Sequence, residues 1–223
     1  MQDLELVIFD LAGTTVEDHG EVPSAFTAAL DEYDIKVTPE QINAVRGSSK
    51  RQALLHLIPE GPAQRRLAEQ IYVSFRDHLA QGYASQGVRP VRGATSAFRL
   101  LREHHVRVAL NTGFDRETTG VLLEALGWNE GTVDAVVCGD DVTQGRPAPY
   151  MIFRAMEITG AGTVHRVANV GDTTLDLQAG YNAGVRWNIG VLTGAHDRRS
   201  LESAPHTHVL SSVAEVTRLW VQD

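Results

Sequence analysis

Aspartates follow two apolar segments of the sequence, in positions where their carboxylates can act together. Asp10 comes directly after residues 4–9, and Asp172 and Asp176 come shortly after residues 166–170. A carboxylate can attack phosphorus and form an acyl-phosphate intermediate. Three carboxylates held close together repel one another unless a cation lies between them, and magnesium accepts oxygen ligands of this kind. The alternative is structural: these aspartates cap a turn and a helix, and Asp176 lies exposed in the first helical turn.

Two other segments offer groups that can bind a phosphoryl oxygen. Thr112 supplies a hydroxyl after residues 106–110, and the loop through Gly113 supplies backbone amides. Gly13 permits a sharp turn whose N–H groups point at an anion. Arg146, which Pro147 follows, is a permanent cation that can offset phosphoryl charge. A structural ion pair with an acidic residue is the alternative for this arginine.

The elements that must position these groups are short strands alternating with amphipathic helices. Residues 117–126 and 150–158 have helical periodicity. The apolar, β-branched runs predict buried strands at residues 4–9, 106–110, 133–137, 166–170 and 185–191. Strand and helix in alternation predict an α/β fold with a Rossmann-like, doubly wound parallel sheet. Ligands of such sheets bind beyond the carboxyl ends of the strands, where these polar residues occur.

Between about residues 21 and 84 the alternation stops, and only helical patterns occur. We expect helices at residues 24–33, 39–45, 51–57 and 64–79. The glycines and proline from Gly87 to Gly93 are typical of a hinge that returns to the sheet. The sequence thus predicts a core domain of residues 1–18 and 87–223, interrupted by a helical domain of residues 19–86.

Composition excludes several classes of partner. The 223 residues carry a formal net charge of −8, which does not suit nucleic acid or an anionic membrane surface. The single cysteine, Cys138, forms no internal disulfide, and neither a secretory signal nor a membrane-length apolar stretch is evident. We therefore expect a cytoplasmic protein, monomeric or homodimeric, that acts on a small molecule.

Together these segments resemble the motifs of the haloacid dehalogenase superfamily of hydrolases, in the order of that family. The resemblance implies that Asp10 is the nucleophile and that the residues 19–86 form a cap over the substrate. It implies a phosphoryl site that includes Ala12, Gly13, Thr112, Gly113 and Arg146. It also implies an Mg²⁺ site formed by Asp10, the backbone carbonyl of Ala12, Asp172 and Asp176.

Ala12 departs from the common phosphatase motif, which has a second aspartate as general acid and base at this position. The segment from Asp10 to Thr15, Asp-Leu-Ala-Gly-Thr-Thr, is similar instead to the phosphonoacetaldehyde hydrolase branch. Members of that branch cleave a carbon–phosphorus bond after a cap lysine forms a Schiff base with the substrate aldehyde. The resemblance therefore implies a small phosphonate, such as phosphonoacetaldehyde, as substrate.

Lys50 is the candidate for this lysine, because Lys36 is the only other lysine in the chain. Around it the chain departs from the branch, with Arg46 in place of a methionine and Ala53 in place of a histidine. One alternative is that Arg46 and Lys50 both bind an anionic group of a different substrate. Another is a phosphomonoesterase of the same superfamily that acts on a small phosphorylated metabolite.

Overall fold

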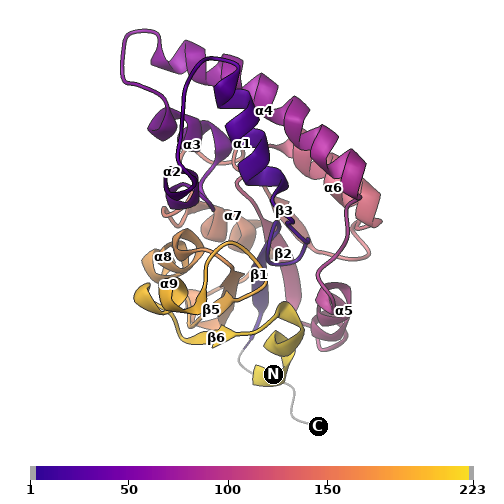
Figure 1. Ribbon diagram of the computed structural model, residues 1–223. Coiled ribbons are helices and arrows are strands. Elements are labelled where there is room, and N and C mark those ends of the chain that lie inside the picture. The colour runs from indigo at the N-terminus through magenta and orange to yellow at the C-terminus, as the bar shows by residue number, and fades with distance from the viewer. Residues whose placement is uncertain (1–3, 221–223) are drawn as a thin grey trace.

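A computed structural model describes residues 4–220, whose backbone forms a six-stranded sheet in which all neighbouring strands are parallel (Figure 1). The strand order is β3-β2-β1-β4-β5-β6. The strands are β1 Leu6–Asp10, β2 Arg107–Asn111, β3 Ala135–Val137, β4 Val167–Gly171, β5 Trp187–Val191 and β6 His208–Leu210. The predicted α/β fold is confirmed, and β6 extends the sheet beyond the five strands expected from the sequence.

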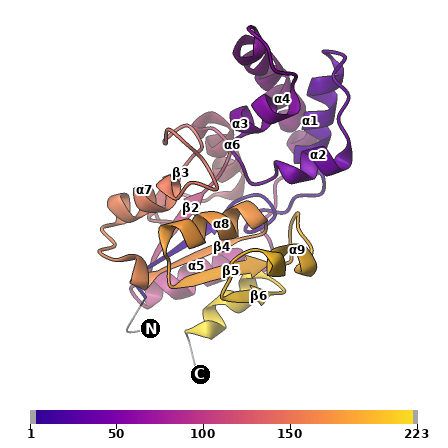
Figure 2. The same cartoon turned by 90° about the vertical axis from the view of Figure 1, so that its left-hand side faces the viewer.

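The central strands β1 and β4 are buried along their whole length, so the sheet has a core on either side. In β1, Leu6 and Ile8 belong to one apolar cluster, whereas Val7 and Phe9 belong to the other. The first cluster includes residues of α7 and α8, and the second includes residues of α5 and η2. Figure 2 shows these helices arranged along the sheet. The helices outside the insertion are α5 Ala94–Glu103, α6 Arg116–Leu126, α7 Tyr150–Thr159, η1 Val164–Arg166, α8 Thr174–Ala183, α9 Arg198–Ser203 and η2 Val213–Leu219.

A helical insertion separates β1 from β2. It contains α1 Glu21–Asp31, α2 Pro39–Ala44, α3 Lys50–Leu57 and α4 Gln64–Gln86. Both Figure 1 and Figure 2 show these helices gathered above the end of the sheet where β1 leads into the insertion. The four expected helices are present, but α4 continues past residue 79 because Leu79 and Tyr83 extend its buried stripe by one turn. Within residues 4–220, no helix combines the length and the apolar character that crossing a membrane requires.

Aromatic packing under β1 provides a test of the core. Phe98 on α5 is fully buried, and its ring centroid lies 5.2 Å from that of Phe9 and 5.0 Å from that of Trp128. We expect Phe98→Ala to lower the free energy of unfolding by about 3–5 kcal/mol, because it removes buried apolar area and leaves a cavity. Urea denaturation measures this change. Phe153→Ala on α7, whose phenylalanine is 43% exposed, is the control and should change the free energy by less than about 1 kcal/mol. Equal effects of the two substitutions would contradict this description of the core.

Candidate active site

The loops that carry the predicted residues meet because their strands are neighbours in the sheet. β1 lies between β2 and β4, and Asp10 is paired in register with Asn111 at the end of β2. β4 ends at Gly171, immediately before Asp172. Since the strands are parallel, these three loops emerge at the same edge of the sheet. The chain crosses over between β1 and β4 in the strand order, and such a crossover is the place where open α/β sheets bind ligands.

Asp10, Asp172 and Asp176 form the predicted carboxylate cluster. Each offers an oxygen atom, these atoms all lie within 4.8 Å of one another, and all three residues are buried. Burial, followed by the charge of Asp10, raises the pKa of the Asp172 carboxyl. Burial also raises the pKa of the Asp176 carboxyl, although Arg146 opposes this shift. Hard oxygen ligands crowded so closely fit a divalent cation, which would relieve their mutual repulsion.

The backbone around Asp172 fixes the direction of its carboxylate. Thr14 Oγ1 donates to Asp172 Oδ1 at 2.9 Å, and the Ala195 N–H donates to Oδ2 at 2.7 Å. A Cβ at Gly13 would lie 2.5 Å from Oδ2, and one at Gly194 would lie 1.9 Å from it. Both positions therefore require glycine, because only a residue without a side chain allows the two loops to approach this carboxylate.

The structure contradicts two details of the structural alternative, namely a helix cap at Asp172 and a solvated Asp176. Thr173, not Asp172, caps α8, and its Oγ1 accepts a hydrogen bond from the Asp176 N–H at 3.3 Å. The Thr173 N–H in turn donates to Asp176 Oδ2 at 3.0 Å. Asp176 is only 1% exposed, so it is not a solvated residue of the first turn. This reciprocal capping holds the Asp176 carboxylate toward the cluster.

Arg146 forms ion pairs with two carboxylates of the cluster and hydrogen bonds with the backbone around them. Its Nη2 lies 2.7 Å from Asp10 Oδ1, and its Nη1 lies 2.9 Å from Asp176 Oδ1. It also donates to the backbone carbonyls of Gly47, at 3.1 Å, and Asn111, at 3.0 Å. Its Nε is buried without a hydrogen-bond partner in the described part of the chain. The ion pair considered from the sequence is thus present, and it lies within the site itself.

Asn111 is a site residue that the sequence analysis did not select. Its side-chain oxygen and its carbonyl both accept hydrogen bonds from Arg146. The only sequence signal is its position at the end of a strand, one residue before Thr112. The register that pairs Asn111 with Asp10 becomes known only when the strand order is known.

The loop after β2 brings Thr112 and Gly113 to the same edge. Thr112 is 2% exposed, and its Oγ1 accepts a hydrogen bond from the Phe114 N–H at 3.2 Å. Its hydroxyl proton can therefore be donated into the site. The Gly113 carbonyl accepts from the Lys50 N–H at 3.1 Å, and a Cβ at Gly113 would lie 2.2 Å from the Ser48 carbonyl oxygen. The insertion thus lies directly on this loop.

Lys50 is placed at the site by the start of α3. Ser49 caps this helix, so the lysine occupies its first turn, where the helix dipole disfavours a cation. The residue is 8% exposed, and Nζ lies 4.7 Å from the Phe114 ring centroid. Burial lowers the pKa of Lys50 to about 8, although the nearby charge of Asp10 opposes this shift. The uncharged share of this amine near neutral pH is therefore larger than that of an ordinary exposed lysine.

One cavity connects the predicted residues of the sheet with those of the insertion. Its lining comprises Asp10, Ala12, Asp18, Val22, Arg46, Gly47, Lys50, Thr112, Gly113, Phe114, Arg146, Asp172 and Thr173. The structure therefore brings Lys50 and Arg46 to the same cavity as Asp10, Thr112 and Arg146. Gly13 and Asp176 are not in this lining, and they lie behind it against Asp172 and Arg146.

Asp18 is the second site residue that the sequence analysis missed. It forms an ion pair with Arg46, and its side chain is 1% exposed, whereas the side chain of neighbouring Glu17 is 35% exposed. The Gly20 N–H also donates to Asp18 Oδ1 at 3.0 Å. No feature of the sequence separates these two adjacent acidic residues, because the path of the chain after β1 decides which of them faces the cavity.

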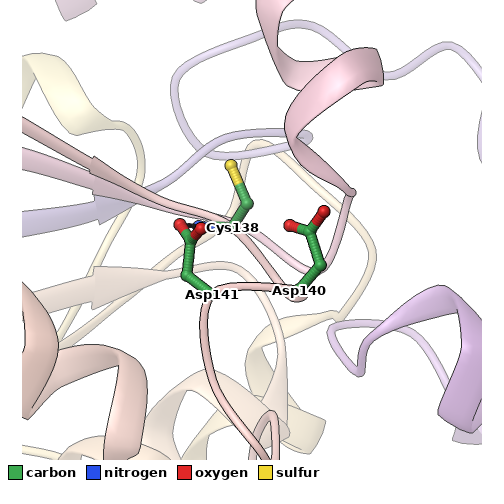
Figure 3. Close-up of side chains that lie close together, drawn as sticks. All are labelled: Cys138, Asp140 and Asp141. Carbon is green, nitrogen blue, oxygen red and sulfur yellow. Dashed lines mark hydrogen bonds between the residues drawn. The ribbon is translucent and has the colours of Figure 1, made fainter.

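A second acidic cluster lies outside this cavity, at the end of β3 (Figure 3). It contains Cys138, Asp140 and Asp141. Asp141 accepts a hydrogen bond from the Cys138 N–H at 2.8 Å and forms an ion pair with Arg116. The backbone N–H of Arg116 donates to Asp140. Burial raises the pKa of the Cys138 thiol to about 11, so it remains protonated at neutral pH. These contacts describe a turn closed by hydrogen bonds and an arginine, which is not the chemistry of a metal site.

Comparison with known proteins agrees with this geometry. Residues 7–189 match the family model of the haloacid dehalogenase-like hydrolases. A phosphonoacetaldehyde hydrolase of Parabacteroides distasonis is 30% identical over 88% of this chain and 79% of its own length. That of Lysinibacillus sphaericus is 30% identical over 87% of this chain and 77% of its own length.

A hydrolase of Pseudomonas syringae has the same fold, with a TM-score of 0.85 at 22% identity over 96% of each chain. A phosphonoacetaldehyde hydrolase-like protein of Oleispira antarctica matches with a TM-score of 0.84 at 22% identity, over 97% of this chain and 91% of its own. The chain therefore belongs to the haloacid dehalogenase-like hydrolases, and it is a phosphonatase-like hydrolase of that superfamily.

Proposed function

We propose that this protein is a magnesium-dependent hydrolase that cleaves the carbon–phosphorus bond of a small phosphonate such as phosphonoacetaldehyde. Asp10 is the nucleophile, and Lys50 forms a Schiff base with the carbonyl of the substrate. The observation that carries the proposal is that the Lys50 amine, with its lowered pKa, lies buried in the same cavity as Asp10. The names of the curated relatives support the same substrate class.

The phosphoryl group is bound at the edge of the sheet. Arg146 supplies a buried positive charge and a buried Nε–H that has no hydrogen-bond partner among the described residues. Thr112 donates its hydroxyl proton, and the loops through Ala12, Gly13 and Gly113 surround the remaining oxygens. Donors that are already fixed in a buried site stabilise developing charge without reorganisation. This end of the cavity therefore suits a phosphoryl group in transfer.

Asp10, Asp172 and the backbone carbonyl of Ala12 would hold Mg²⁺, with Asp176 beside them. The bound ion would supply positive charge that offsets the carboxylates and the phosphoryl oxygens. Thr14 and the Ala195 N–H already direct Asp172, which reduces the reorganisation needed on binding. Asp176 holds Arg146 at 2.9 Å and so links the cation site to the phosphoryl site.

Lys50 makes the carbon a workable leaving group. Its neutral amine adds to the aldehyde and eliminates water to give an iminium ion. A carboxylate oxygen of Asp10 then bonds to phosphorus while the carbon–phosphorus bond breaks. The electron pair of the breaking bond moves into the iminium to form an enamine. Water releases phosphate from the acyl phosphate. Protonation of the enamine carbon and hydrolysis of the iminium release the aldehyde and restore Lys50.

This mechanism explains why Ala12 can occupy the position of the usual acid. A phosphate ester requires a proton for its leaving oxygen, whereas here the iminium nitrogen accepts the electron pair of the leaving carbon. A side chain that donates a proton two residues after Asp10 is therefore unnecessary. The methyl group of Ala12 leaves space beside the nucleophile.

We further propose that residues 19–86 act as a cap domain on a core of residues 1–18 and 87–223. Hydrogen bonds between the two parts support this division into cap and core. Arg146 donates to the Gly47 carbonyl, and the Lys50 N–H donates to the Gly113 carbonyl. Tyr72 Oη donates to Asp115 Oδ2 at 2.7 Å. Apolar residues of the two parts also belong to one buried cluster, so a cap that closes over the substrate buries apolar surface as well as excluding water.

Asp10→Asn tests the nucleophile. We expect phosphate release from phosphonoacetaldehyde to fall by at least about 1,000-fold, because an amide does not attack phosphorus at a useful rate. The assay uses a panel of phosphonates and phosphate esters, with magnesium and with EDTA. Asp34→Asn is the matched control, since Asp34 is exposed and asparagine tolerates its positive φ. Unchanged activity of Asp10→Asn, or no effect of EDTA, would refute the proposal, and hydrolysis of esters alone would indicate a phosphomonoesterase.

The two lysines provide a direct test of the Schiff base. Borohydride added with phosphonoacetaldehyde should attach the reduced substrate to Lys50, and mass spectrometry of peptides locates the modification. Lys50→Arg should abolish both trapping and turnover, whereas Lys36→Arg, at an exposed residue, should affect neither. The rate should rise as the pH increases toward about 8, because the amine reacts only after it loses its proton. Full activity of Lys50→Arg would exclude the Schiff base.

Magnesium should stabilise the protein more at high pH than at low pH. The pKa values of Asp172 and Asp176 are raised in the fold, so the folded protein holds these protons more tightly than the unfolded chain does. Without metal, the contribution of these groups to stability therefore falls as the pH rises and they lose their protons. We expect the rise in Tm with magnesium, measured by differential scanning fluorimetry, to be larger at pH 8 than at pH 5 and to decrease strongly in Asp172→Asn. Equal shifts at both pH values would contradict this cation site.

A further inference from the structure

Two arginine–carboxylate pairs line the cavity that contains Lys50. Arg146 pairs with Asp10 at the edge of the sheet, and Arg46 pairs with Asp18 where the insertion meets the chain leaving β1. The first pair belongs to the phosphoryl end of the proposed reaction. The second pair has no part in that chemistry, although burying a charged pair costs free energy. It therefore calls for a separate explanation.

Arg46 keeps donors that a ligand can use. A guanidinium has five N–H donors, and the ion pair with Asp18 engages one terminal nitrogen, Nη2. Asp18 is 1% exposed and is held by the Gly20 N–H, so it fixes the position of the arginine. The side chain of Arg46 retains 17% exposure, and Arg46 lines both this cavity and a second pocket beside α1 and α2. A planar group with several donors is best matched by a carboxylate, which accepts two parallel hydrogen bonds.

The carboxylate would lie next to the group that reacts with Lys50. Gly47, with φ of 89°, turns the chain between Arg46 and Lys50, and both residues line one cavity although only three residues separate them. Their proximity is also electrostatic, since the charge of Arg46 contributes to the lowered pKa of Lys50. Once Lys50 has formed the iminium, a carboxylate on the adjacent carbon would offset the repulsion between this new cation and Arg46. The hydrogen atom of an aldehyde carries no charge and does not have this effect.

We propose that the substrate is a 2-oxo acid with a phosphonate group on C3, and that Arg46 binds the carboxylate while Lys50 reacts with the adjacent carbonyl. This inference rests on the proposed function and specifies the organic portion of its substrate. Asp18 acts as a positioning residue that orients Arg46. The carboxylate occupies the place of the aldehyde hydrogen of phosphonoacetaldehyde, so the reacting atoms remain the same.

The reaction balances in the same way as that of the aldehyde. The Lys50 amine condenses with the C2 carbonyl and releases water, and attack by Asp10 moves the electron pair of the carbon–phosphorus bond through C3 into the iminium. A proton from water adds to C3, water cleaves the acyl phosphate, and water hydrolyses the iminium. One phosphonate and one net water give one 2-oxo acid and one phosphate, without an oxidant or reductant.

The test compares 3-phosphonopyruvate with phosphonoacetaldehyde as substrates of the 223-residue chain with magnesium. We expect the unmodified protein to have the higher kcat/KM for 3-phosphonopyruvate. Arg46→Met should lower that value by about 10- to 100-fold, the loss expected for a charge-assisted carboxylate contact, mainly through KM. Because the substitution also leaves Asp18 unpaired and removes a charge that lowers the pKa of Lys50, the decisive quantity is the ratio of kcat/KM for 3-phosphonopyruvate to that for phosphonoacetaldehyde, which should fall by about 10-fold or more. Arg46→Lys, which keeps the charge, should recover part of the preference and serves as the check that position 46 tolerates substitution.

A binding measurement separates this inference from the proposed function. Calorimetry in the Asp10→Asn background should show tighter binding of 3-phosphonopyruvate than of phosphonoacetaldehyde, and Arg46→Met should remove the difference. If phosphonoacetaldehyde is cleaved but the carboxylate confers no preference, or if Arg46→Met affects both compounds equally, the inference is wrong and the proposed function stands. If neither compound is cleaved, the proposed function fails, and the binding preference still decides whether Arg46 recognises a carboxylate.

Discussion

The repulsion among three buried carboxylates is the constraint on which this site depends. Asp10, Asp172 and Asp176 converge because β1 and β4 are adjacent parallel strands, and nothing in the apolar core offsets their charge. Arg146 contacts two of the three, and Thr14 and the Ala195 N–H stabilise the third. Closely spaced carboxylates in a buried position require such partners or a cation. Much of the surrounding sequence, including the glycines against Asp172, serves this requirement.

The helical insertion completes a site that the sheet alone leaves unfinished. The sheet edge contributes the carboxylates, Thr112 and Arg146, but every amine or further cation at the cavity comes from the insertion. Lys50 is buried because the loop preceding α3 lies on Gly113, and Arg146 donates to the Gly47 carbonyl of that same loop. The lowered pKa of Lys50 is therefore a property of the assembled protein and not of α3. Movement of the insertion would change both access to the cavity and the charge state of this amine.

Ala12 and Arg46 show how a shared fold acquires a particular chemistry. The sheet and the carboxylate cluster agree with membership of a superfamily in which many reactions share a fold. Ala12 removes a proton donor beside Asp10, which is consistent with a leaving group activated elsewhere in the cavity. Arg46 and Asp18 place a charged pair next to Lys50. In this chain, the departures from the family motifs thus lie around Asp10 and not at Asp10 itself.

The sequence by itself determined the parallel α/β fold, the helical insertion and the segments that supply Asp10, Thr112, Arg146 and Asp172. These follow from local patterns: short apolar, β-branched runs, helical stripes, and polar residues placed directly after strands. Only the tertiary structure decided that Asn111 holds Arg146, that Asp18 and not Glu17 faces the cavity, and that Asp176 is buried. Contacts such as that of Thr14 with Asp172 join residues 158 positions apart. Local patterns do not contain them, because strand order, register and the path of each loop are fixed only when the whole sheet assembles.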